Sequence, residues 1–213
     1  MKCLVILAIL FLGEGAGLRA DTAPDFKVTI IAVTEFSDPS LKEQGLIDGI
    51  NKATIQLKSF FENNFHTNPE VFTVGKETSG HFLRTWLVNT LPVTSRGSIH
   101  LIFVLTHGFA YKTAEQDTNK SDLFLATSDT VKETFAGVAV KGSEFIDAFR
   151  LLPKRTTVLL FLDTCGSGAI DSDALKATLQ HDPDFASRVF ILAASMQDES
   201  AYSARFSQIL ASL

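Results

Sequence analysis

The stretch TTVLLFLDTCGSGAI, residues 156–170, combines an apolar run with an abrupt polar end. A short apolar run bounded by glycine and serine predicts a strand buried in a parallel sheet. The run stops at Asp163, and Cys165 follows where the chain leaves the predicted sheet. This stretch therefore predicts a central sheet and a thiol exposed at its carboxyl edge.

Apolar runs alternate with segments of helical periodicity along the rest of the chain. This alternation predicts an α/β fold, a three-layer α/β/α sandwich with a mostly parallel central sheet. The most apolar run, at 98–106, is expected to be the central strand. The other strands are predicted at 27–33, 70–74, 156–163 and 188–195. Helices are predicted at 45–65, 171–180 and 204–213. Two more should begin after the capping residues Ser79 and Ser143, and Pro92 should end the first of these two. The last helix should bury a stripe of Phe206, Ile209, Leu210 and Leu213. Segments 123–129 and 137–140 predict a short antiparallel excursion, after a surface loop at 112–122.

The composition fits one globular domain. Of 213 residues, 46% are hydrophobic and 20% are charged, which is enough apolar material for a substantial core. The net charge of −5 and the absence of a basic cluster longer than Pro-Lys-Arg argue against nucleic-acid or anionic-membrane partners. The expected partners are peptides, proteins or small molecules.

The first twenty residues resemble an export signal. Lys2 provides the charged start, residues 3–12 form an apolar segment, and small residues follow. The segment is too short to span a bilayer, which needs about 20 apolar residues. We therefore expect a signal peptide at 1–20 and a single globular domain at 21–213 that is secreted or otherwise exported, periplasmic in a bacterium, without stable membrane association. The alternative is an uncleaved N-terminus of a cytosolic protein.

Removal of that leader would leave Cys165 as the sole cysteine, because the other is Cys3. An exported chain with one thiol cannot form an internal disulfide, which favours a reactive or intermolecular role. The alternative is a small buried side chain, since unpaired cysteine is commonly buried.

A histidine follows the end of another predicted strand, in VLTHGFA at 104–110. Since functional residues gather outside the carboxyl ends of parallel strands, His107 and Cys165 would emerge side by side if their strands are neighbours. An imidazole raises the thiolate fraction of a nearby cysteine. The amides of Gly108 and Cys165 could hold an oxyanion. The sequence thus predicts a Cys/His dyad.

Three segments, LIFVLTHGFA (101–110), VLLFLDTCGSGAI (158–170) and RVFILAASMQDESAYS (188–203), together resemble the caspase-like cysteine peptidases of clan CD. The resemblance is closest to the metacaspase and bacterial caspase-homologue branch. It implies a caspase-haemoglobinase-like fold and a cysteine endopeptidase. It also implies that His107 is the general base and acid, that Cys165 is the nucleophile, and that Gly108 and Cys165 donate to the oxyanion.

The resemblance also carries expectations about substrate preference. Asp163 matches an aspartate that lines the pocket for a basic residue before the scissile bond; its alternative role is a strand-end carboxylate that caps loop amides. Leu105 replaces a serine of the family, for which Thr106 is a partial substitute. Lys52 stands where the family has an acid, and a lysine there would weaken attraction for Arg or Lys. Its alternative is a solvated residue on a helix face. Cleavage after basic residues is the expectation.

No cofactor is expected, and no metal site is predicted. The remaining histidines have no partner at metal-ligand spacing: His66, His81, His100 and His181. Calcium activates some metacaspases, and only the acidic SMQDES segment at 195–200 hints at it. A second function class stays open, a caspase-like module that binds or scaffolds without cutting.

Overall fold

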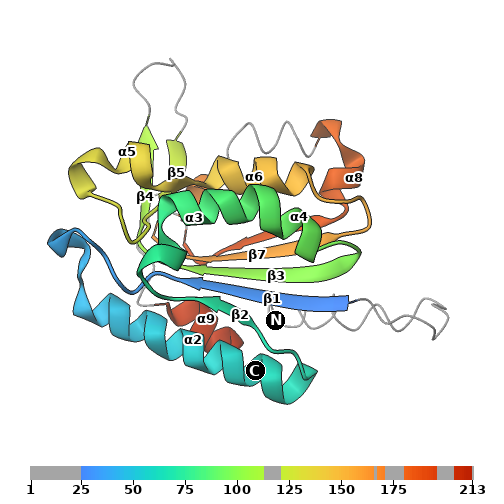
Figure 1. Ribbon diagram of the computed structural model, residues 1–213, viewed down its shortest axis with the longest axis horizontal. Helices are drawn as coiled ribbons and strands as arrows, with labels where there is room; N and C mark the ends of the chain where they lie inside the picture. Colours follow the sequence, from blue (N-terminus) through green and yellow to red (C-terminus); the bar gives the residue numbers. More distant parts are fainter. Residues whose placement is uncertain (1–24, 113–120, 166, 171–179, 196–203, 213) are drawn as a thin grey trace.

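The computed structural model describes residues 25–112, 121–165, 167–170, 180–195 and 204–212. Five strands form the central sheet in the order β2-β1-β3-β7-β8, and all neighbouring pairs are parallel (Figure 1). β3 is the middle strand, as its sequence predicts. The strands are β1 (Asp25–Ala32), β2 (Glu70–Phe72), β3 (Ser98–Leu105), β7 (Thr157–Asp163) and β8 (Val189–Ala193).

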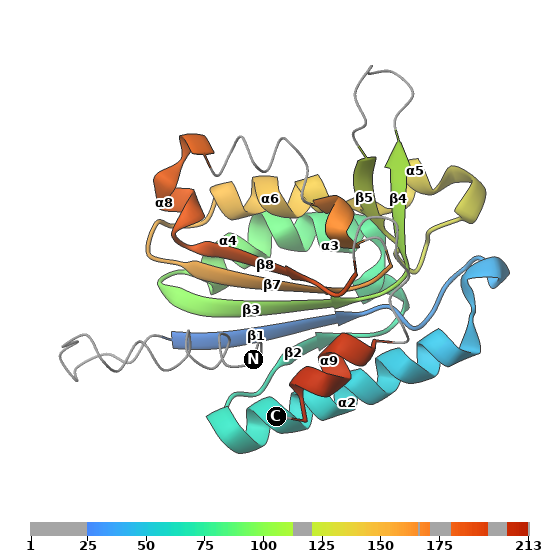
Figure 2. The same ribbon diagram turned by 180° about the vertical axis from the view of Figure 1, so that it is seen from behind.

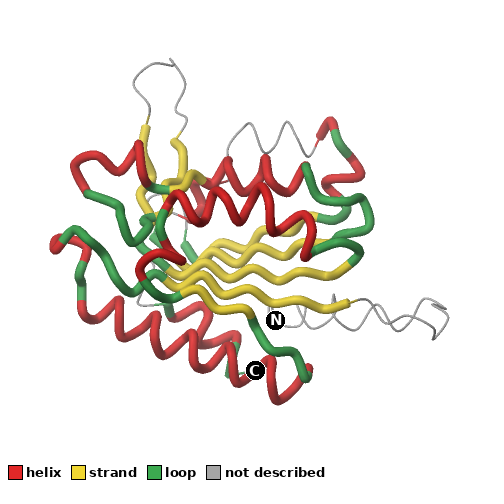
Figure 3. The backbone as a smooth tube through the Cα atoms, in the orientation of Figure 1, coloured by secondary structure: helices red, strands yellow, loops and turns green. Residues whose placement is uncertain are grey.

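Helices cover both faces of this sheet, so the predicted α/β/α sandwich is confirmed (Figure 3). One face carries the long helix α2 (Gln44–Phe65) and the short α9 (Arg205–Leu210), which lie side by side in Figure 2. The other face is covered by α3 (Gly80–Thr85), the π-helix η3 (Trp86–Thr90), α4 (Leu91–Thr94), α6 (Gly142–Arg150) and α8 (Pro183–Ala186).

The core consists of two clusters, one on each side of the sheet. Side chains along β3 alternate between them: Ile102 and Val104 pack toward α3 and α6, whereas Leu101 and Phe103 pack toward α2 and α9. Successive residues of a strand point to opposite faces, and here both faces are covered. This is why the strand sequences are continuous apolar runs without polar alternation.

A second, three-stranded antiparallel sheet stands at the carboxyl end of the central sheet (Figure 1). It contains β4 (Gly108–Lys112), β5 (Ser121–Leu125) and β6 (Val140–Lys141). The predicted antiparallel excursion is confirmed for β5. Of the predicted segment 137–140, only Val140 belongs to β6, because residues 137–138 lie in a short helix. β4 was not predicted, because its pairing with β5 is set by tertiary contact. Most of the predicted loop at 112–122 lies outside the described residues.

Short helical segments connect these elements. They are η1 (Pro39–Leu41), η2 (Gly75–Thr78), η4 (Lys132–Thr134), α5 (Phe135–Val138) and η5 (Ser167–Ile170).

Helix termini test several sequence expectations. Ser79 caps α3, since its hydroxyl accepts the N–H of Phe82, as predicted. Pro92 does not end that helical region: it lies in α4, which follows the π-helix η3 without a break. Ser143 is not the cap of α6. That helix begins at Gly142, because the Glu144 carboxylate accepts the N–H of Lys141 at 2.9 Å.

The C-terminal helix matches its prediction in part. Phe206 and Leu210 of α9 pack against the core, but Ile209 is 52% exposed, so its predicted burial is wrong. Ser207 takes a buried position instead. Leu213, residues 171–179 of the predicted helix at 171–180 and the predicted signal peptide lie outside the described residues. Within the described ranges, none of the helices has the length and apolar character required to cross a bilayer.

Candidate active site

The pairing of β3 with β7 brings the two candidate catalytic residues to one edge of the sheet. The strands are parallel neighbours whose last paired residues are Leu105 and Asp163. His107 follows two residues after Leu105, and Cys165 two residues after Asp163. The adjacency on which the dyad prediction depends is therefore present (Figure 2).

Gly108 lies directly against the segment that carries the cysteine. A Cβ at this position would collide with the Thr164 hydroxyl oxygen and with the Cys165 carbonyl oxygen. Only glycine permits two backbones to approach this closely. The segments that follow β3 and β7 are thus in backbone contact at the point where His107 and Cys165 emerge.

The His107 ring is held in one orientation. Its Nε2 lies 2.9 Å from the carbonyl oxygen of Leu41, in η1. Since a carbonyl oxygen only accepts, Nε2 must donate, and the neutral ring then carries no proton on Nδ1. The rings of Phe36 and Phe109 flank it, at centroid distances of 5.3 and 6.4 Å. Nδ1 is therefore the nitrogen that can act as a base.

The environment of His107 favours the neutral imidazole. Burial lowers its pKa below the usual 6.5, and this effect outweighs the hydrogen bond to Leu41 and the nearby Glu43 carboxylate, which act in the opposite direction. Lys132 lowers the pKa further. A neutral ring at pH 7 can accept a proton, as a general base requires.

Cys165 is half-buried and belongs to no disulfide among the described residues. A buried pair of serines fixes the chain on either side of it. Ser167 Oγ donates to Ser195 O at 3.2 Å and accepts from Ser195 N at 3.0 Å. Ser195 Oγ in turn donates to Thr164 O at 3.2 Å. These bonds tie the segment after β7 to the end of β8.

Asp163 is buried, with 2% of its surface exposed. Its Oδ2 accepts the backbone N–H of Ser207 at 2.7 Å, which caps the first turn of α9. Burial raises the pKa of the Asp163 carboxyl, and the Ser207 N–H opposes that shift. Ala204 precedes this helix and offers no side-chain oxygen for the same purpose. The carboxylate thus caps a backbone amide, the alternative considered for it, and its role in substrate binding stays a prediction.

The other two predicted specificity residues lie in contrasting places. Thr106 is buried, and its hydroxyl donates to Ala126 O at 2.7 Å. Lys52 is exposed on α2, between the buried residues Ile50 and Ala53. Contact of either residue with substrate stays a prediction.

Sequence reasoning missed three contributions to this site. The Leu41 carbonyl and the Phe36 ring come from the segment between β1 and α2, more than sixty residues before His107. The Ser167 and Ser195 hydroxyls lie just past the ends of β7 and β8, as His107 and Cys165 lie just past the ends of β3 and β7. Their pairing depends on the adjacency of β7 and β8, which no local pattern encodes.

In the part of the chain that the structure describes, no group of three or more His, Cys, Asp or Glu side chains could hold a metal ion. Most of the acidic segment at 195–200 lies outside that part.

No protein-family model matches the sequence, and none of the curated proteins matches it. Solved structures with a similar arrangement include Raptor from Chaetomium thermophilum, with 14% identity and a TM-score of 0.53, covering 90% of this chain and 18% of that one. Protein GSU0716 from Geobacter sulfurreducens is 10% identical with a TM-score of 0.47, covering 87% of this chain and 62% of that one. This chain therefore spans less than two thirds of either protein, and the likeness to Raptor concerns the fold alone.

Proposed function

We propose that this protein is a cysteine endopeptidase that acts through a His107–Cys165 dyad and an acyl-enzyme. The observation that carries the proposal is the register of β3 and β7, which brings both residues to one sheet edge. The resemblance of three sequence segments to caspase-like peptidases supports it. The caspase-haemoglobinase-like assignment of the fold belongs to the same proposal.

The proposed reaction uses the groups described above. The Cys165 thiol gives its proton to His107 Nδ1, and the sulfur attacks the peptide carbonyl. The amides of Gly108 and Cys165 stabilise the oxyanion. His107 then protonates the leaving amine, whose C–N bond breaks. Water, deprotonated by the same imidazole, hydrolyses the thioester and returns the thiol.

The expected preference is for a basic residue before the scissile bond. Asp163 and Thr106 would bind that residue, and Lys52 would weaken the attraction for Arg or Lys. For Asp163 to contact a substrate, the N–H of Ser207 would have to release its carboxylate. Binding of a basic side chain by Asp163 therefore requires α9 to move away from the carboxylate.

The hydrogen bond from Ser207 to Asp163 also favours a second candidate function, a caspase-like module that binds a protein partner without cutting. In the described arrangement α9 engages the carboxylate that would hold a basic side chain. A scaffold would keep that arrangement permanently.

Hydrolysis of a fluorogenic peptide panel tests the choice. The panel carries Arg, Lys, Asp, Asn or Leu before the reporter, and it is run with calcium and with a chelator. Turnover that disappears in Cys165→Ala supports the peptidase. Covalent labelling of Cys165 by a peptide acyloxymethyl ketone should depend on His107. The absence of both turnover and His107-dependent labelling would favour the binding module.

A further inference from the structure

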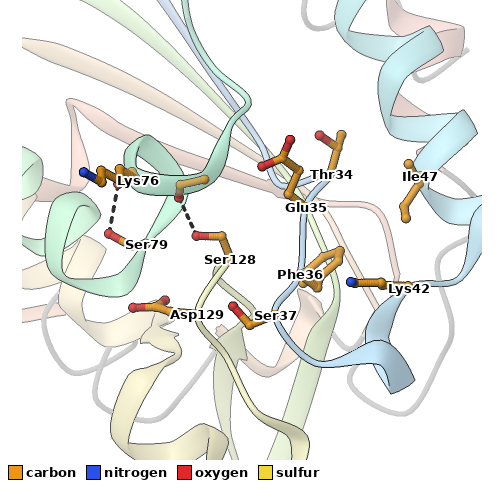
Figure 4. Close-up of a pocket in the computed structure, with 11 residues that line it drawn as sticks. Thr34, Glu35, Phe36, Ser37, Lys42, Ile47, Lys76, Ser79, Ser128 and Asp129 are labelled. Carbon is orange, nitrogen blue, oxygen red and sulfur yellow. Dashed lines mark hydrogen bonds between the residues drawn. The ribbon is translucent and has the colours of Figure 1, made fainter.

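A cavity of about 600 Å³ opens beyond the carboxyl ends of β1 and β2 (Figure 4). Its lining comes from residues 34–37 after β1, from Gly75, Lys76 and Ser79 after β2, and from residues 128–129 after β5, together with Lys42 and Ile47. The chain passes from β1 to β2 on one side of β1 and then returns to β3 on the other side. This reversal of strand order, where open parallel sheets bind ligands, falls between β1 and β3, and the cavity borders it through residues 34–37 after β1.

The three segments that form the cavity are tied to one another. Ser37 N donates to Ser128 O at 2.7 Å, and Ser128 Oγ donates to Gly75 O at 2.5 Å. Thr34 Oγ1 donates to Thr73 O at 3.2 Å. A cavity held in this way exists before a ligand arrives, which lowers the ordering cost of binding.

Phe36 joins the cavity to the candidate active site. Its ring is among the lining residues, and its centroid lies 5.3 Å from that of the His107 imidazole. In the proposed reaction His107 protonates the leaving amine, so the departing part of the peptide lies on the histidine side of the scissile bond. The cavity is the space that the Phe36 ring connects to the imidazole.

Near Phe36, a positive side chain faces the cavity, whereas the carboxylates that line it lie farther from this ring. In Figure 4, Lys42 extends toward the Phe36 ring, while the Glu35 carboxylate points away from it. Asp129 lies at the far end, where its Oδ1 accepts from Gly80 N at 2.9 Å and from Thr127 Oγ1 at 2.7 Å. No carboxylate of the described residues forms an ion pair with Lys42.

We propose that this cavity is a subsite for the peptide segment that follows the scissile bond, and that Lys42 selects an acidic side chain there. The apolar faces of Phe36 and Ile47 contact the aliphatic part of that side chain, and the Lys42 ammonium pairs with its carboxylate. This inference rests on the proposed peptidase function, since the direction of the substrate comes from the role of His107.

Internally quenched peptides test the selection. They share one sequence before the scissile bond and carry Glu, Ala or Lys at the first positions after it. The protein should cleave the Glu series with a kcat/KM about fivefold above the Lys series, the size expected for an exposed ion pair. Lys42→Glu should reverse the order. Lys58→Glu, an equal change of charge on the exposed face of α2, should leave it unchanged.

A binding measurement separates this inference from the proposed function. Fluorescent peptides of the Glu and Lys series are titrated into Cys165→Ala, with and without Lys42→Glu, so that no turnover is needed. Lys42-dependent preference for the Glu peptide without cleavage by the unmodified protein would overturn the peptidase and retain an acidic-peptide site. Equal affinity for both peptides would overturn the subsite, even if the unmodified protein cleaves them.

Discussion

Two histidines near opposite ends of β3 differ in what surrounds their ring nitrogens. His100, near the amino end, is 2% exposed, with Nε2 2.8 Å from Thr29 Oγ1 and Nδ1 in contact with Ser95 Oγ. A hydroxyl both donates and accepts, so these two partners occupy both nitrogens in either tautomer. Burial lowers the pKa of His100 to about 4.

His107, two residues past the carboxyl end, has a backbone carbonyl as the partner of Nε2. That acceptor fixes the tautomer and directs the basic Nδ1 away from the bond. Burial lowers the pKa of both rings, yet the arrangement at His100 serves structure, whereas that at His107 suits proton transfer. The lesson is that the partner of each nitrogen, more than burial, distinguishes the two.

The largest effect should separate the histidines by activity. His107→Ala removes the proposed base and should lower kcat/KM by about 10²- to 10⁴-fold. His100→Gln should keep most of the activity, because its site lies at the other end of the strand. Rates on the best peptide of the panel, with folding checked by circular dichroism, measure both. Equal losses in the two variants would contradict the distinction.

Acid should lower the stability of the fold through the buried His100. The pKa of His100 is about 4 in the folded protein and near 6.5 in the unfolded chain, so the unfolded chain binds a proton that the folded one does not. The contribution of His100 to the free energy of unfolding, about 3 kcal/mol, is therefore fully present above pH 6.5 and is lost as the pH falls toward 4.

Urea unfolding at about pH 7.5 and about pH 4.5 measures this loss, compared with His100→Gln, which cannot titrate. The variant should lose less stability than the unmodified protein over the same range. An identical loss in both would assign the acid sensitivity to other groups.

Two glycines sharpen the contrast between the ends of β3. Gly108→Ala should destabilise the fold by about 1–3 kcal/mol and reduce peptide hydrolysis, because the new methyl group displaces the Cys165 backbone. Gly97, before β3, has φ +71° and open space around a Cβ. Gly97→Asn, a residue that tolerates this conformation, should therefore cost less than about 1 kcal/mol and leave hydrolysis unchanged. Urea midpoints and peptide rates decide; similar results at both sites would refute the close approach at Gly108.

The smallest effect concerns the aromatic neighbours of His107. Phe36→Ala admits water to the imidazole, so the pKa of His107 should rise toward 6.5 by a fraction of a unit. An NMR titration of the His107 ring measures the shift without requiring turnover. Phe65→Ala, at the far end of α2, is the control and should leave this pKa unchanged. An unchanged pKa in Phe36→Ala would show that its ring does not shield the imidazole.

Much of the central sheet could be predicted because burial on both faces makes a strand a continuous apolar run. The runs at 98–106 and 156–163 locate β3 and β7 to within one residue at each end. Helix starts were less predictable. Ser79 caps its helix through a local contact, whereas the start of α6 depends on Glu144, whose carboxylate also pairs with Arg84 sixty residues earlier.

The candidate site likewise contains residues that the sequence predicts and contacts that it does not. His107, Gly108 and Cys165 could be proposed from sequence, because each lies within three residues of the end of an apolar strand. The contacts of Asp163 with Ser207, and of His107 with Leu41, join segments 44 and 66 residues apart. No local pattern predicts such partners, since they depend on which elements pack together.

By itself, the sequence determined the α/β architecture, the central place of β3 and the position of a histidine and a cysteine just beyond two strand ends. Apolar periodicity carries that information, because it records which faces of a segment avoid water. Only the tertiary structure decided that β3 and β7 are neighbours, that a carbonyl from η1 fixes the tautomer of His107, and that α9 covers Asp163. These are contacts between distant segments, and their geometry is set by packing of the whole chain rather than by any one stretch of it.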